Sequence, residues 1–263
     1  MTNIAPGGTA GGKAHVARRS FAARAAMLSF LLVATAAFAA LGIWQVQRLI
    51  WKNDLISRVD ARVAAAPVAT PGPDRWARIT AADDEYTRVF VSGHFLHDKE
   101  AHVVAVTELG PGYWVLTPLA TADGSVVLIN RGFVTSERRD PANRTAGQIE
   151  GATTVTGLLR ISEESNWILR KNDPEADRWY RRAPAEFAKA RGLDNAAPFF
   201  VDADATPNAG DWPVGGLTRV RFSNSHLVYA LTWFVMALLA AAASVYFVRV
   251  EFGGKSPKRG QAA

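Results

Sequence analysis

Two runs of 22 residues without a charged side chain, Ala25–Val46 and Leu227–Val248, constrain this chain of 263 residues more than any other feature. A helix of that length reaches about 33 Å, which is enough for the roughly 30 Å hydrocarbon core of a membrane. A helix buried in a soluble domain is rarely so long and so free of charge on every face. The two runs therefore predict transmembrane helices over residues 25–46 and 227–248.

The first run also has features of a cleavable signal peptide. Basic residues precede it, Ala37-Phe38-Ala39 resembles a cleavage site, and Arg18–Phe21 resembles a twin-arginine motif. The apolar core of a signal peptide, however, is only about 7 to 15 residues long. Because this run is longer and a second apolar run lies downstream, we predict that the first run is retained as a membrane anchor.

The positive charge of the chain gathers at its two ends. The formal net charge is +6 and the sequence pI is about 9.8, values that by themselves favour a nucleic acid partner. Residues 1–26 carry +4 and residues 249–263 carry +3, so the remainder of the chain is close to neutral. A basic face for nucleic acid is therefore not expected.

The same charges predict a topology. Basic residues that flank membrane spans stay in the cytoplasm, so residues 1–24 and 249–263 are predicted to be basic cytoplasmic tails, the first of them disordered. Residues 47–225 are then translocated, into a periplasm or an intermembrane space. The Ala and Arg bias suggests a GC-rich bacterium, which would place this segment in the periplasm, the helices in the cell inner membrane, and membrane lipids among the partners. The absence of cysteine excludes disulfides and thiolate metal sites.

The translocated segment is predicted to be one β-rich domain. An amphipathic helix continues from the first span over residues 47–66 until Pro67 stops it. Apolar alternation then predicts strands over residues 87–93, 102–107, 113–119, 125–130, 153–160, 199–202 and 217–222. Pro111-Gly112 and Asp123-Gly124 predict reversals between strands.

Only one soluble helix beyond residue 66 is indicated with any strength, over residues 184–191. Pro184 stands near its start and Gly192 follows its end, as is typical of helix termini. The expected fold class is therefore an α+β membrane protein, with two transmembrane helices flanking one β-rich external domain that has few short helices.

One histidine, His226, immediately precedes the second uncharged run. On a helix, His226, Tyr229 and Trp233 share one face, and Trp44 and Arg48 share one stripe of the first helix. Both groups fit an aromatic and snorkelling belt at the membrane surface. They also fit a metal or haem site, because a neutral imidazole beside an apolar slab suits a flat, apolar porphyrin. The spacing leaves both interpretations open.

No catalytic constellation is present in the sequence. There is no nucleophile elbow, zincin helix or glycine-rich phosphate loop, so we do not expect an enzyme. His94, His97 and His102 form the one cluster of potential metal ligands. In a strand-turn-strand segment these side chains need not converge, and no carboxylate pattern completes them. A structural or solvent role is therefore predicted for all three.

Several motifs in a fixed order resemble one family. They are LGIWQVQRLIWKNDLI (41–56), PGYWVLTPL (111–119), LINRGFV (128–134), KNDP with WYRR (171–182), PFFVDA (198–203), PVGGLTRV (213–220) and NSHLVYALTWF (224–234). Together they resemble the surfeit locus protein family, the membrane-bound assembly factors of haem-copper cytochrome oxidase. The resemblance runs from about residue 41 to residue 248. Ala183 stands where an acidic residue usually follows the WYRR-like segment, and Thr135 replaces a common proline.

The resemblance implies a function and a site. It implies an assembly factor that binds haem a and helps to insert it into subunit I of cytochrome c oxidase, with subunit I and haem a synthase as partners. In bacterial members a histidine at the start of the second span is implicated in haem a binding, and His226 stands at that position. Trp44, Arg48, Tyr229 and Trp233 are then expected to form the walls and rim of the haem site. A non-haem scaffold and a histidine-based copper carrier remain as alternatives.

Overall fold

A computed structural model describes residues 20–163, 170–218, 220 and 222–253 of the chain. Most of the two predicted basic tails, and Arg219, which the sequence also suggests as a contact for haem propionates or lipid phosphates, lie outside the described residues. The chain divides into two compact units, one formed by residues 1–53 with 223–263 and the other by residues 54–222.

The first unit contains one long apolar helix and most of another, whose last residues, 54–64, belong to the second unit. Helix α1 runs from Phe21 to Ala64 and α4 from His226 to Glu251, so residues 25–46 and 47–64 form one uninterrupted helix. By length and composition, both helices are long and apolar enough to cross a membrane. The expectation of two apolar helices that flank a β-rich domain in the sequence is confirmed.

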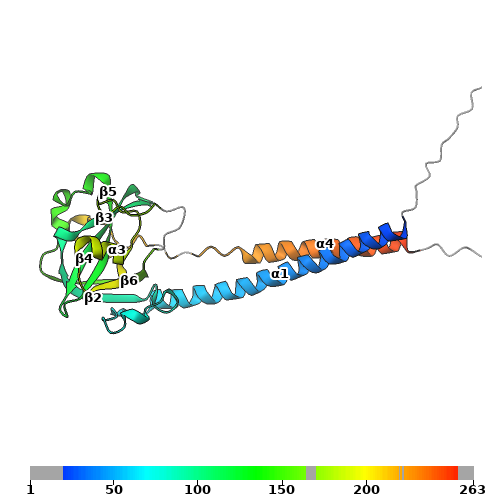
Figure 1. Cartoon of the computed structure of the whole chain (residues 1–263), viewed down its shortest axis with the longest axis horizontal. Helices are drawn as coiled ribbons and strands as arrows, with labels where there is room; N and C mark the ends of the chain where they lie inside the picture. The colour runs from blue at the N-terminus through cyan, green and yellow to red at the C-terminus, as the bar shows by residue number, and fades with distance from the viewer. Residues whose placement is uncertain (1–19, 164–169, 219, 221, 254–263) are drawn as a thin grey trace, which may run out of the picture. The chain divides into compact units, whose positions relative to one another are not determined.

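Small residues allow α1 and α4 to approach each other, and Figure 1 shows them side by side. A Cβ atom on Gly42 would lie 2.6 Å from the ring of Phe234, so the absence of a side chain lets this ring pack against α1. On α4 the buried residues Ala230, Ala237 and Ser244 recur every seven positions. Small residues at such spacing are the usual contact surface of helices that associate within a membrane.

The second unit is built around a sheet that closes on itself. Its strands are β1 (Val68–Ala69), β2 (Arg88–Phe95), β3 (Ala101–Thr107), β4 (Gly110–Thr121), β5 (Val126–Thr135), β6 (Ala152–Ile161) and β7 (Ala196–Ala203). They follow the order β1-β2-β6-β7-β5-β4-β3, and β2 also pairs with β4. The extra pairing joins β2, β6, β7, β5 and β4 into a closed ring of strands, with β1 and β3 attached outside it.

Alternation along the strands produces two cores. On β7, Phe199 and Val201 face the inside of the ring together with Val127 and Ile129 of β5. Phe200 points the other way, because successive strand residues face opposite sides, and it packs in a second core that includes residues of β3, β4 and α3 (Pro184–Arg191). The remaining helical elements are α2 (Ala81–Asp84) and the 3-10 turns η1 (Trp76–Arg78), η2 (His97–Lys99), η3 (Ser136–Arg138), η4 (Pro141–Gly147) and η5 (Ala209–Asp211).

The structure corrects three sequence-based predictions in the β-rich unit. The reversal between β3 and β4 lies at Glu108-Leu109, whereas Pro111-Gly112 is part of β4. The described residues between 217 and 222 form no strand, because their contacts are made by single side chains, such as the Phe222 ring against Tyr86, rather than by a ladder. Strand β5 does not end at Asn130 but continues to Thr135 through an irregularity.

That irregularity is a β-bulge at Arg131. Val115 pairs with Gly132 and Leu116 with Asn130, so Arg131 is the additional residue. Gly132 has a φ of +130°, and a Cβ atom there would lie 2.2 Å from the carbonyl oxygen of Val214. Only glycine meets both demands, since it tolerates positive φ and has no side chain to clash.

Gly132→Ala is therefore expected to lower the free energy of unfolding by more than about 2 kcal/mol, from backbone strain and from the clash together. Gly124→Ala is the matched control, because Gly124 also has positive φ (+77°) but nothing lies within 4 Å of its Cβ position. The control should lose only about 1 kcal/mol. Denaturant unfolding of both variants tests this, and equal losses would show that the contact with Val214 does not matter.

Candidate functional site

The imidazole of His226 is held by a side chain from the other apolar helix. His226 begins α4, and its Nδ1 lies 2.8 Å from Oε1 of Gln45, which is buried on α1. An amide oxygen only accepts hydrogen bonds, so Nδ1 carries the proton that it donates. In the neutral ring Nε2 then keeps its lone pair. Histidines that bind a metal are usually arranged in this way. One ring nitrogen donates a hydrogen bond that orients the ring, and the other nitrogen binds the metal.

Gln45 was not singled out by the sequence-based analysis. Its signal was its position, because it is an uncharged polar residue within an apolar run and one turn beyond Gly42, a further residue of the helix contact. Polar side chains in such runs face protein rather than lipid.

The other predicted site residues differ in their exposure and in their contacts. Trp44 and Tyr229 are each 53% exposed, while the guanidinium of Arg48 lies 4.3 Å from the ring centroid of Trp51. Trp233 stacks on Phe38 at a centroid distance of 5.8 Å. Among the described residues, no hydrogen bond or ring contact joins any of these four side chains to His226. Trp44 and Tyr229 thus present free aromatic faces, and Trp233 belongs to the contact between the helices.

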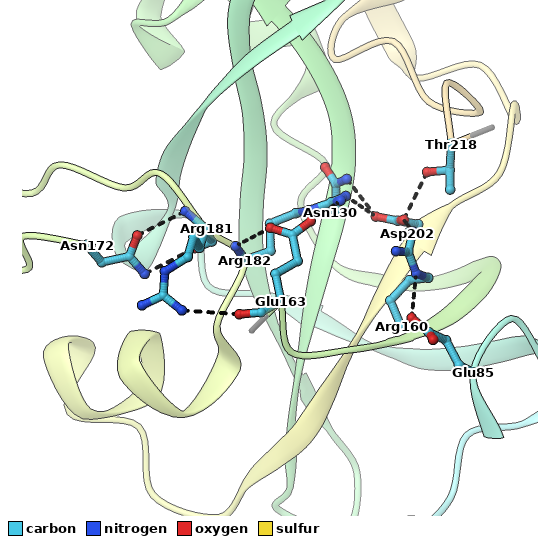
Figure 2. Close-up of polar contacts among 9 residues, drawn as sticks. All are labelled: Glu85, Asn130, Arg160, Glu163, Asn172, Arg181, Arg182, Asp202 and Thr218. Carbon is cyan, nitrogen blue, oxygen red and sulfur yellow. Dashed lines mark hydrogen bonds and ion pairs between the residues drawn. The ribbon is translucent and has the colours of Figure 1, made fainter. Parts of the chain in front are cut away.

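One polar network of the β-rich unit centres on Asp202, which Figure 2 shows between four donors. Its carboxylate is 1% exposed. Oδ1 accepts hydrogen bonds from Asn130 (2.7 Å) and Arg182 (3.0 Å), and Oδ2 accepts from Arg160 (3.0 Å) and Thr218 (2.9 Å).

Two further carboxylates complete this network. Arg160 also pairs with Glu85, and Arg182 pairs with Glu163, so each guanidinium contacts two acidic groups. Every carboxylate oxygen of Asp202 is engaged, and the donors come from β5, β6 and two loops. The network therefore joins segments that are distant in the sequence.

A second buried cluster surrounds Glu100, whose side chain is 3% exposed. The carboxylate accepts hydrogen bonds from Thr117 (3.2 Å), His102 (2.9 Å) and Arg144, while Nη1 of Arg131 lies 3.9 Å from Oε2. Burial by itself would raise the pKa of Glu100, but the hydrogen bonds from His102 and Arg144 outweigh it and lower the pKa from 4.5 to about 2.

This lowered pKa predicts a loss of stability in acid. The ionised carboxylate stabilises the fold fully above the ordinary pKa of 4.5, and the contribution, roughly 3 kcal/mol, disappears as the pH falls through the folded-state pKa of about 2. Glu100→Gln should be less stable than wild type at pH 7 and should lack this part of the acid transition. Glu137→Gln, on the exposed η3 turn, is the control. Unfolding curves between pH 7 and pH 2 that fall in parallel for wild type and Glu100→Gln would contradict the assignment.

The three histidines of the β-rich unit have separate surroundings. His94 is exposed on β2, Nε2 of His97 lies 2.9 Å from the carbonyl oxygen of Ile149, and His102 contacts Glu100. Within the described part of the chain, no group of three or more His, Asp or Glu side chains is arranged to hold a metal ion. Each of the three side chains thus has its own surroundings, and their structural or solvent role stays a prediction.

Most of this chain is similar in sequence to known proteins. The model of the SURF1 family matches residues 32–238. Surfeit locus protein 1 of Mus musculus is 36% identical over 234 residues, covering 83% of this chain and 74% of the mouse protein. The Homo sapiens protein is 35% identical over 234 residues, covering 82% and 75%. A SURF1-like protein of Monosiga brevicollis is 36% identical over 234 residues, covering 83% and 86%.

The matched segment begins within α1, contains the whole β-rich unit and ends within α4, so it includes both partners of the His226–Gln45 hydrogen bond. Because the family model covers well over half of the chain and the relatives cover about four fifths of it, this chain belongs to the SURF1 family.

Proposed function

We propose that this protein is a membrane-bound assembly factor for haem-copper cytochrome c oxidase that binds haem a through His226 and assists its insertion into subunit I. Membership of the SURF1 family supports the role in oxidase assembly. The hydrogen bond between His226 and Gln45 is the observation that carries the haem proposal, because it leaves Nε2 with a lone pair. The role is one of binding and delivery, without catalysis.

In this proposal haem a is a cargo, and its iron accepts an imidazole nitrogen as axial ligand. Gln45 keeps the proton on Nδ1 and orients the ring, so that Nε2 is the coordinating atom. The exposed aromatic faces of Trp44 and Tyr229 provide apolar surface for the macrocycle. Arg48 supplies a positive charge on the same helix as Trp44, and Trp233 supports α4 by stacking on Phe38.

A single protein ligand suits a carrier. Coordination from one side leaves the second axial position to weaker ligands, so the cargo is released when a client offers histidines of its own. We propose subunit I as the client and haem a synthase as the source of the cargo.

The proposal places both apolar helices across the cell inner membrane, with the two termini in the cytoplasm and the β-rich unit in the periplasm. The basic charge near both chain ends supports this orientation. A reporter fused after Ala263 is expected to be active only in the cytoplasm, and one inserted at the exposed turn near Asp123 only in the periplasm. Mature protein that begins near residue 40 would contradict the model of two spans.

The full-length protein, purified in detergent from cells that make haem a, tests the function. It is expected to show a Soret band, and its pyridine haemochrome spectrum should identify haem a. Deletion of the gene should lower the haem a content of the oxidase while its subunits are still made. Purified protein without haem, combined with a loss of oxidase subunits from the membrane, would favour the scaffold instead.

A further inference from the structure

The bulge in β5 directs an arginine into the interior of the ring of strands. Val127 and Ile129 line the first core, and Arg131 is the extra residue of the bulge that follows them. Its side chain is 2% exposed, which makes it one of the largest fully buried side chains among the described residues. Bulges often redirect a side chain beside a functional site.

The guanidinium of Arg131 is poorly satisfied. Nη2 donates to the carbonyl oxygen of Gly147, and the ring of Phe95 lies 4.7 Å from the guanidinium carbon. Nε and Nη1 have no hydrogen-bond partner within the described ranges. Burial lowers the pKa of Arg131 to about 10, while Glu100 opposes the shift, so the group remains charged at neutral pH.

The nearest carboxylate is already engaged by other donors. Glu100 accepts from Arg144, His102 and Thr117, and it approaches Arg131 only to 3.9 Å. Two buried guanidinium groups thus share one buried carboxylate, which leaves one positive charge in excess. A buried charge without a paired counter-charge costs several kcal/mol, so an anion at Arg131 would stabilise the fold.

Arg131 lines a cavity of about 130 Å³ in this unit. That volume exceeds what a few water molecules need and is enough for a small organic ion. Its wall contains apolar side chains, among them Phe95, Ile129 and Val155. It also contains hydroxyl groups, such as those of Thr153 and Thr206.

One acidic residue, Asp204, also lines the cavity. Its Oδ1 accepts from the backbone nitrogen and the hydroxyl of Thr206, and its Oδ2 lies 3.9 Å from Arg88. Asp204 therefore has its own donors, but its charge disfavours a multivalent anion in the same cavity. A short monocarboxylate fits better, because its single charge would meet Arg131 and its alkyl part the apolar wall.

We propose that this cavity is a binding site for a small monocarboxylate, whose negative charge is compensated by the guanidinium of Arg131. This site lies wholly within the β-rich unit and does not depend on haem binding at His226.

Fluoroacetate, observed by fluorine NMR, is the probe for this site in the full-length protein in detergent. At constant ionic strength in chloride, its resonance is expected to broaden saturably on addition of protein and to sharpen again when acetate competes. Arg131→Met should weaken binding at least about tenfold, since it removes the charged donor. Arg78→Met, which removes an exposed arginine on η1, should bind as wild type does.

A second variant keeps the test decisive where Arg131→Met does not fold. Thr153→Leu leaves Arg131 intact but fills space on the cavity wall, because Thr153 shares a strand face with Val155. It should also weaken binding, with the melting temperature measured alongside. Broadening that does not saturate, equal broadening in Arg131→Met and Arg78→Met, or displacement by inorganic phosphate but not by acetate would each overturn the proposal.

Discussion

Replacing His226 with alanine is expected to yield purified protein without the haem of the proposed function, at an unchanged level in the membrane fraction. The imidazole is the proposed axial ligand, and its Nδ1 is committed to Gln45. Nothing else on α4 near this position offers a nitrogen ligand. The expected readouts are the loss of the Soret band from the purified protein and a lower haem a content of the oxidase.

Graded variants separate ligation from packing. Gln45→Leu removes the acceptor that orients the ring, so haem affinity should fall by about tenfold or more while some binding persists. Trp44→Ala should reduce binding less severely than His226→Ala, because Trp44 offers surface rather than a ligand. His94→Ala, which removes an exposed histidine of β2, is the matched control and should bind haem normally. Full haem content with an unchanged Soret band in His226→Ala would refute the ligand and favour the scaffold.

Asp202→Ala is expected to destabilise the β-rich unit by about 3 to 5 kcal/mol, because it removes the common partner of two partly buried guanidinium groups. Asn130 and Thr218 lose their acceptor at the same time. A loss of that size is a large fraction of the stability of an ordinary domain, commonly about 5 to 15 kcal/mol. The variant should therefore unfold at a much lower denaturant concentration than wild type, or fail to accumulate in cells.

Two further variants calibrate this result. Asp202→Asn keeps the shape and some hydrogen bonds, so it should lose less than Asp202→Ala. Asp173→Ala breaks an exposed ion pair with Arg178 and should leave the unfolding transition almost unchanged. Tryptophan fluorescence during denaturant unfolding reports the transition. If Asp202→Ala were as stable as Asp173→Ala, the network of Figure 2 would not hold the segments together.

Local sequence patterns were sufficient for α1, α3 and α4, but not for the short α2. The uncharged runs predicted two long apolar helices, and Pro184 with Gly192 predicted α3 at residues 184–191, where the structure has it. The strands from β2 to β7 were also recognised from alternation, although with shorter bounds. Helix ends and strand faces depend on residues close in sequence, so short-range patterns reveal them.

Features that depend on distant partners were missed or misplaced. The bulge at Arg131 exists because Val115 and Leu116 pair around it and because Val214 closes on Gly132. The reversal at Glu108-Leu109 is set by the register of β3 on β4, which moves Pro111-Gly112 into the strand. The described residues of the predicted strand 217–222 form no ladder, and Thr218 donates to Asp202 through its side chain.

The sequence by itself determined that this chain has two apolar helices with a β-rich domain between them, and that a histidine stands at the start of the last helix. It also determined the family. Each of these features depends on neighbouring residues or on short motifs. Only the tertiary structure decided that Gln45 holds His226, that Asp202 joins four donors and that Arg131 is buried with two nitrogens unbonded to any described residue. These features arise where segments up to 181 positions apart meet, and the hydrogen bonds and charges across such contacts leave no periodic trace in the chain.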